Sequence, residues 1–277
     1  MVDLAIRLDP ELRESVRIAL AAGKIIQTIR QDGLEAMRKA DKSVVTRADL
    51  EADAFICREL DKCFPGDALL SEEEGYQAGD SGRTWIIDPL DGTQGFLEGG
   101  ADYAVHIGLV VDGSPLIGVV HEPETGRLYQ ALATVGTFLS FGKGGTMRQL
   151  RVKGGDLETT RLITSWRLKE DERRNLADAA GVVDGGTAHS VGIKVGKLVR
   201  REAEAYYSVH PVNLWDICAP QVVLEAAGGR VTDLSGAPIA YTPEAADTRI
   251  VGPFLASNGG HHDALCENIR SFQASQD

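Results

Sequence analysis

Two aspartates, Asp88 and Asp91, stand three residues apart directly after the apolar run 85–87. That run has the composition of a buried strand, and the Asp-Pro pair at 88–89 interrupts any regular helix or strand. A turn of this kind can direct both carboxylates into one small space, where they repel each other unless protons or cations neutralise them. Hard oxygen ligands suit Mg²⁺ or Mn²⁺. Read alone, the stretch predicts either a divalent-metal site or an ordinary acidic β-turn.

The residues that follow, Gly92 and Thr93, lead into a segment at 94–97 that could begin a helix. Free backbone N–H groups at such a turn or helix start form a binding site for anions. A pair of metal ions beside an anion site indicates phosphoryl transfer to water. Chemistry at phosphorus is therefore the first hypothesis for this stretch.

Three further acidic residues stand where elements begin or end. Glu72 follows the apolar strand 68–71, and Asp49 lies between a short strand at 44–46 and a helix expected over 50–64. Asp216 lies 125 residues beyond Asp91, next to Trp215 and ahead of a helix. Each has a plain alternative, because acidic runs are usually solvated and an Asp before a helix is an ordinary N-cap. Only a fold that brings them to Asp88 would give them one shared role.

Residues 88–93, Asp-Pro-Leu-Asp-Gly-Thr, resemble the signature of the Mg²⁺-dependent, lithium-sensitive phosphatases of the inositol monophosphatase superfamily. Three other motifs follow the family's order: Val-Thr-x-x-Asp at 45–49, Ser-Glu-Glu at 71–73 and Trp-Asp at 215–216. The resemblance covers roughly residues 41–257. It implies an α+β fold, layered as an α/β/α/β/α sandwich, with the site between two domains. A polar hinge near 153–156 suggests domains at 1–153 and 154–277.

The resemblance also implies a role for each matching residue. Two or three Mg²⁺ ions, or Mn²⁺ as a substitute, would be held by Glu72, Asp88, the carbonyl of Leu90, Asp91 and Asp216. A water activated by the metal and ordered by three catalytic residues would attack phosphorus; these are Asp49, Glu72 and Thr93. In the family, the Asp that matches Asp49 hydrogen-bonds the Thr that matches Thr93. The substrate would be held by Gly92, Thr93, Ser190, Lys194 and Asp216.

Within the superfamily, the segments 94–100, 103–105, 192–194 and 215–220 look closest to the 3′(2′),5′-bisphosphate nucleotidases of the CysQ type. This branch removes the 3′-phosphate of adenosine 3′,5′-bisphosphate and releases AMP and phosphate. Two positions depart from it: Gln94 replaces the usual Lys, and Trp166 follows Ser165 where His is common. The alternatives are an inositol-1-phosphate or other sugar-phosphate phosphatase, or a non-catalytic protein that binds a phosphorylated metabolite. For Lys194, the alternative is an ordinary lysine on a helix surface.

Composition limits the partners. The chain has 277 residues, of which 43% are hydrophobic, and a formal net charge of −12. Such a charge argues against binding a nucleic-acid polymer or an anionic membrane, but not a small phosphorylated metabolite beside a bound metal. The four cysteines lack metal-ligand spacing, which predicts reduced thiols in a cytoplasmic protein. The sequence also shows no N-terminal signal and no apolar run long enough to span a membrane, in agreement with that prediction. His261 and His262 are expected on the surface at a helix start, His106 and His121 receive no role, and homodimers are common in the superfamily.

Overall fold

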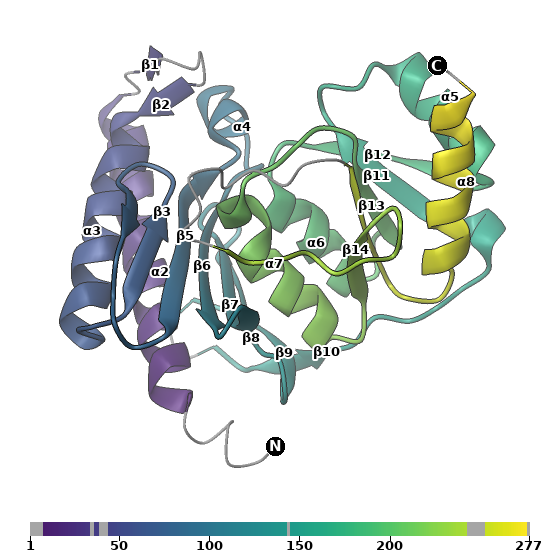
Figure 1. The fold of residues 1–277 in the computed structure, drawn as a ribbon. Coiled ribbons are helices and arrows are strands. Elements are labelled where there is room, and N and C mark those ends of the chain that lie inside the picture. Colours follow the sequence, from purple (N-terminus) through teal and green to yellow (C-terminus); the bar gives the residue numbers. More distant parts are fainter. Residues whose placement is uncertain (1–7, 34–35, 39–43, 143–144, 243–252, 276–277) are drawn as a thin grey trace.

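A computed structural model of the chain describes residues 8–33, 36–38, 44–142, 145–242 and 253–275. Its elements form five layers (Figure 1). Helices α2 (Asp9–Asp32) and α3 (Arg47–Cys63) cover the outer face of a large sheet, and α6 (Val191–Val199) and α7 (Leu214–Ala226) lie between it and a smaller sheet. Helices α5 (Glu170–Ala180) and α8 (His262–Ala274) cover the far side. The predicted α/β/α/β/α sandwich is thereby confirmed.

The large sheet has eight strands in the order β10-β9-β8-β7-β6-β5-β3-β4. Their bounds are β3 (Ala68–Ser71), β4 (Gly75–Gln77), β5 (Arg83–Asp91), β6 (Ala104–Val111), β7 (Ser114–Glu122), β8 (Arg127–Leu132), β9 (Gly136–Phe141) and β10 (Arg148–Leu150). Neighbours are antiparallel except β3 and β5, which run parallel. Asp112 and Gly113 both have positive φ at the turn between β6 and β7, which confirms the predicted Asp-Gly hairpin.

Strand β5 crosses the middle of this sheet, and eight of its nine residues are buried. The ring of Trp85 stacks on Phe64, and its indole N–H donates to Asp67 at 2.9 Å. The ladder between β5 and β6 is regular up to Asp88 and then shifts before Asp91. Pro89 lies inside this irregular stretch and has no N–H to contribute to a ladder. The break therefore turns the end of a rigid, buried strand into a short segment that can present carboxylates.

The smaller sheet has the order β12-β11-β13-β15-β14. Its strands are β11 (Arg161–Ser165), β12 (Val183–Ala188), β13 (Ala205–Ser208), β14 (Arg230–Asp233) and β15 (Phe254–Ser257). The remaining elements are the pair β1 (Ala36–Arg38) and β2 (Val44–Thr46), the short helix α4 (Thr93–Leu97) and the 3₁₀ turn η1 (Leu157–Thr159). Among the described residues, no helix combines the length and apolar character needed to cross a bilayer.

Helix α7 packs against both sheets within one continuous apolar core. Two glycines of the large sheet permit its close approach: a Cβ on Gly118 would lie 2.4 Å from the carbonyl oxygen of Ala219, and one on Gly108 would lie 2.6 Å from Cys218 Sγ. The two sheets use residues on either side of the boundary expected near 153. The division into domains 1–153 and 154–277 stays a prediction, because this core joins the two parts.

The expectation for His262 is wrong. Its side chain is buried, at 1% exposure, and its ring joins strands β14 and β15. Nε2 lies 2.7 Å from Thr232 Oγ1, and Nδ1 lies 2.8 Å from Ser257 Oγ. The sequence shows two adjacent histidines at a helix start, but only the packing of α8 on the sheet decides which of them turns inward.

Candidate active site

The site begins at the irregular end of β5. Asp88 is 1% exposed, and its Oδ1 accepts the N–H of Leu90 at 3.0 Å, which closes a tight turn around Pro89. Asp91 is 6% exposed and lies three residues further along the same strand. The turn directs both carboxylates into a single space, as their spacing predicts.

Asp216 reaches this space from the first turn of α7. One oxygen from each of Asp88, Asp91 and Asp216 lies within 4.8 Å of the other two. Asp216 Oδ2 accepts the N–H of Asn213 at 2.6 Å. Asp216 therefore belongs both to the capping box at the start of α7 and to the acidic cluster. The fold closes the gap of 125 residues between the Asp88 motif and the Trp-Asp motif.

Glu72 is placed beside the cluster by parallel pairing. Ser71, the last residue of β3, lies opposite Ile87 on β5, so Glu72 comes level with Asp88. The N–H of Glu72 donates to the carbonyl of Ile87 at 3.3 Å, and Glu72 lines the same cavity as Asp91 and Asp216.

The charges of the cluster affect one another strongly. Burial, and then the charges of neighbouring carboxylates with Glu72 first, raise the pKa of Asp88 well above its usual range. Burial and the charge of Asp91 raise the pKa of Asp216 to about 7. Carboxylates that raise one another's pKa in this way fit divalent cations, which would relieve the repulsion and prefer oxygen ligands. The donor set therefore fits Mg²⁺ or Mn²⁺.

Asp49 joins helix α3 to the turn after β5. The N-cap of α3 is Thr46 rather than Asp49, because the helix begins at Arg47, three residues earlier than the sequence indicates. Asp49 Oδ2 accepts the backbone N–H of Thr46 at 2.8 Å. Asp49 Oδ1 accepts the hydroxyl of Thr93 at 3.0 Å, which is the pairing that the family resemblance implies. The Thr93 hydroxyl also lies 3.2 Å from the carbonyl oxygen of Leu90.

Three groups from other elements surround the second oxygen of Asp91. Asp91 Oδ2 accepts the Ser190 hydroxyl at 2.6 Å and the N–H of Gly192 at 3.0 Å, and the Nε2 of His106 lies 3.3 Å away. Both donors stand at the start of α6, and a Cβ on Gly192 would lie 2.2 Å from the His106 ring. This arrangement leaves Asp91 Oδ1 as the oxygen available to a cation.

This finding changes two expectations. The Ser190 hydroxyl, expected on the substrate, is fully buried, and it holds Asp91 while its oxygen accepts the N–H of Ile193 as the N-cap of α6. His106, to which the sequence assigns nothing, contacts the acidic cluster. The alternation of strand residues does not reveal this role, because it shows that the ring is buried but not which side chain faces it.

A cavity of about 430 Å³ opens from the acidic cluster. It is lined in part by Gly92, Thr93, Trp166, His189, Lys194 and Asp216. The exposed ring of Trp166 stacks on His189 with centroids 4.7 Å apart, and the Arg167 guanidinium lies over the Trp166 ring at 5.6 Å. These side chains come from the end of β11 and from the loop before α6, so the smaller sheet supplies this wall.

Lys194 is a buried lysine of this wall and not a surface residue of α6. Its side chain is 2% exposed, and its ammonium donates to the carbonyl of His189 at 2.9 Å and lies 4.8 Å from the centre of the Tyr206 ring. Burial lowers the pKa of Lys194 to about 8, against the opposing effect of nearby aspartates, Asp91 first. A mostly charged ammonium inside a ligand-sized cavity is suited to bind an anion.

A layered α/β/α/β/α fold with buried carboxylates at its centre, beside a cavity with a positive charge, defines a metal-dependent phosphatase. The inositol monophosphatase family model matches residues 8–274. The chain belongs to the inositol monophosphatase family.

Curated relatives with different names are equally similar. A histidinol-phosphatase of Chlorobaculum parvum is 30% identical over 231 residues, which cover 83% of this chain and 88% of the relative. The 3′(2′),5′-bisphosphate nucleotidase CysQ of Escherichia coli K12 is 30% identical over 243 residues, covering 84% and 94%. Among solved structures, the inositol monophosphatase of Anabaena (Nostoc) sp. PCC 7120 is 26% identical with a TM-score of 0.75, covering 96% of this chain and 97% of that one. These likenesses support phosphatase activity but do not identify the substrate, which is inferred below from the cavity.

Proposed function

We propose that this phosphatase removes the 3′-phosphate of adenosine 3′,5′-bisphosphate and releases AMP and phosphate. The observation that carries the proposal is the wall of the cavity beside the acidic cluster. Trp166 stacked on His189 offers a flat aromatic surface to a base, and the buried ammonium of Lys194 offers a charge to a second phosphate. The volume of about 430 Å³ lies within the range of roughly 300–1,000 Å³ that is usual for pockets binding drug-sized ligands.

In this proposal the cations are held by oxygens of five residues, namely Glu72, Asp88, Leu90, Asp91 and Asp216. Bound Mg²⁺ would supply Lewis-acid activation of water and stabilise charge on the transferred phosphoryl group. The residues of the chain supply positions. Asp49 orients the Thr93 hydroxyl, and Thr93 with Glu72 orients the attacking water. Gly92 and Thr93 present backbone N–H groups to phosphate oxygens.

The buried ammonium of Lys194 in the wall suggests how a bisphosphate is distinguished from a monophosphate. With a pKa of about 8, Lys194 carries its charge at neutral pH. It lines the same cavity as the acidic cluster but is not one of the proposed metal ligands, and in this proposal it binds the phosphate that is not hydrolysed. Gln94 also lines the cavity, at the position where the nucleotidase branch usually has Lys.

A second candidate is hydrolysis of histidinol phosphate, which is favoured by the relative from Chlorobaculum parvum and by an aromatic wall that an imidazole ring could also contact. Inositol 1-phosphate and other sugar phosphates form the remaining alternative. They have no flat ring to stack on Trp166. Inhibition by Li⁺ and a homodimeric state remain parts of the proposal that the family resemblance alone supports. The cytoplasmic location remains a prediction from the cysteine content and the N-terminal sequence.

The test is phosphate release with Mg²⁺ from adenosine 3′,5′-bisphosphate, histidinol phosphate, inositol 1-phosphate and fructose 1,6-bisphosphate. We expect the nucleotide to be preferred at least a hundredfold in kcat/KM, which corresponds to about 2.7 kcal/mol. Trp166→Ala should raise KM for the nucleotide about tenfold, since one base stack contributes roughly 1–3 kcal/mol, and should leave KM for inositol 1-phosphate nearly unchanged. A preference for inositol 1-phosphate, or equal effects of the substitution on both substrates, would contradict the nucleotide proposal.

A further inference from the structure

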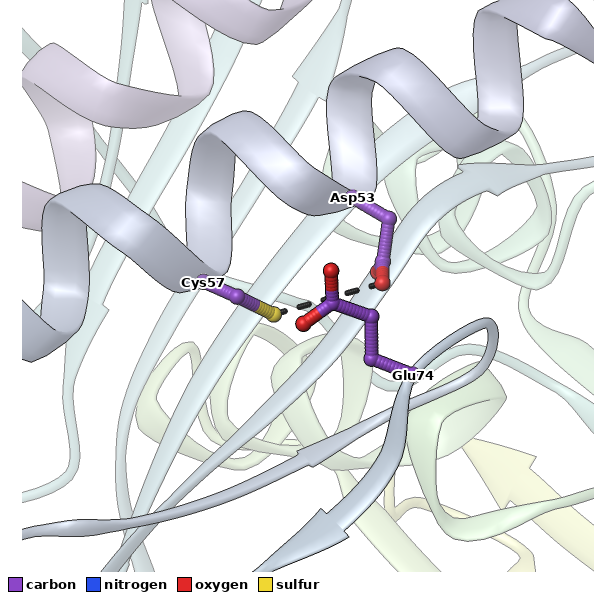
Figure 2. Close-up of side chains that lie close together, drawn as sticks. All are labelled: Asp53, Cys57 and Glu74. Atoms are coloured by element: carbon purple, nitrogen blue, oxygen red, sulfur yellow. Dashed lines mark hydrogen bonds between the residues drawn. The ribbon is translucent and has the colours of Figure 1, made fainter.

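Helix α3 carries a second buried carboxylate, Asp53, one turn after Asp49. Its side chain has no exposed surface. Asp53 Oδ1 accepts a hydrogen bond from the hydroxyl of Ser71, and Oδ2 lies 4.0 Å from the sulfur of Cys57. Figure 2 shows Asp53 and Cys57 on the helix with the carboxylate of Glu74 directed toward them from the neighbouring turn.

Three ligand atoms of Asp53, Cys57 and Glu74 lie within 4.8 Å of one another, which raises the question of a second metal site. The contacts of these three residues argue against a second metal site. The two oxygens of Asp53 already face Ser71 and Cys57, and burial raises the pKa of Cys57 to about 12, so the sulfur stays a thiol and not the thiolate that ligates metals. Glu74 is exposed to solvent. The cluster is better explained by a role in positioning the turn that follows β3.

Ser71 connects Asp53 to the turn that follows β3. Its hydroxyl donates to Asp53, while its oxygen faces the backbone N–H groups of Glu73 at 3.3 Å and Glu74 at 3.4 Å. Ser71 is itself fully buried, and the next residue is Glu72. A buried hydroxyl needs an acceptor for its proton, and Asp53 supplies it from a neighbouring helix.

We propose that Asp53 is a positioning residue that fixes the turn at 72–74, and with it the carboxylate of Glu72, relative to helix α3. One helix then sets two parts of the site: Asp49 orients Thr93 after β5, and Asp53, acting through Ser71, orients Glu72 after β3. This inference rests on the proposed role of Glu72 as a metal ligand. It predicts that the loss of Asp53 weakens metal binding although Asp53 contacts neither the metal nor the substrate.

The experiment compares Asp53→Ala and Ser71→Ala with the wild type. Mn²⁺ affinity is measured directly by calorimetry or by electron paramagnetic resonance, and the Mg²⁺ concentration for half-maximal activity is measured with the preferred substrate. We expect both constants to rise about 10–100-fold, the usual effect of removing a group that orients a metal ligand. The kcat at saturating Mg²⁺ should recover to within a few-fold of the wild type. Asp53→Asn keeps an acceptor for Ser71. Its two constants should lie between those of the wild type and those of Asp53→Ala.

Glu74→Gln and Cys57→Ser are matched controls from the same cluster, and both should leave the Mg²⁺ requirement within about twofold. If they weaken metal binding as much as Asp53→Ala does, the cluster is itself an ion site and the inference is overturned. It is also overturned if Asp53→Ala and Ser71→Ala lower stability or kcat without changing metal affinity, because that is the result of a purely structural role. If the wild type binds no Mn²⁺, the assignment of Glu72 as a metal ligand fails together with the inference about Asp53. If the wild type binds Mn²⁺ and only the expected effect of Asp53→Ala is absent, the inference about Asp53 fails alone.

Discussion

Replacing Asp88 with asparagine should abolish turnover and at the same time stabilise the metal-free protein. Asp88 is 1% exposed and lies with Asp91 and Asp216 in a group whose oxygens are within 4.8 Å of one another. A pair of unit charges roughly 4.5 Å apart repels by about 4 kcal/mol at an effective dielectric constant of 20. Asparagine has the shape of the protonated acid, and its oxygen can still accept the N–H of Leu90. The substitution therefore removes a charge without removing the hydrogen bond.

The magnitude depends on pH in a defined direction. In the metal-free fold, burial and the charges of neighbouring carboxylates raise the pKa of Asp88 well above its usual range. A raised pKa contributes stability that is complete below the unfolded value, about 3.9, and is lost as the pH rises toward the folded value. Each pH unit between the unfolded and the folded value corresponds to about 1.36 kcal/mol of lost stability. The advantage of Asp88→Asn should therefore be absent near pH 4 and should grow as the pH rises from there to 7.

The assay is thermal unfolding in EDTA at both pH values, repeated with Mg²⁺ at pH 7. At a hundred times its dissociation constant, Mg²⁺ should stabilise the wild type by about 2.7 kcal/mol, or roughly 5–10 °C in Tm, and should hardly affect the variant. Asp61→Asn, an exposed carboxylate of α3, is the control and should change neither value. The reasoning is refuted if Asp88→Asn is less stable than the wild type in EDTA at pH 7, or if Mg²⁺ does not stabilise the wild type.

Two further predictions concern residues that the tertiary structure assigns. Ser190→Ala removes both a donor to Asp91 and the N-cap of α6. We expect the free energy of unfolding in urea to fall by about 1 kcal/mol and the Mg²⁺ concentration for half-maximal activity to rise at least tenfold. An unchanged Mg²⁺ requirement would show that Asp91 needs no such support. Burial lowers the pKa of His262 to about 4, so its contribution to stability is complete above the unfolded value of about 6.5 and is lost as the pH falls toward 4. Relative to His262→Gln, the wild type should therefore lose about 3 kcal/mol over this interval in unfolding experiments, and parallel pH profiles of the two proteins would contradict the assignment.

The sequence alone determined the parts of the site that depend on short spacing. Asp88 and Asp91 share a turn because an Asp-Pro pair ends a buried strand, and a stretch of nine residues is enough to predict this turn. The hairpin at Asp112-Gly113 follows from the same kind of local rule. The distant members, Glu72, Asp49 and Asp216, were predicted through the family resemblance and not through spacing, because periodicity does not indicate which elements meet in space.

Only the tertiary structure decided how these carboxylates are held. His106 and Ser190 contact Asp91 because β6 and the start of α6 pack against the end of β5. Asp53 and Ser71 meet between a helix and a strand, and Lys194 is buried although a lysine on a helix is ordinarily a surface residue. The physical reason is that burying a polar group requires a partner, and the partner is supplied by packing between segments far apart in the chain. Local sequence determines which groups need partners, and the packing of sheets and helices determines which partners they receive.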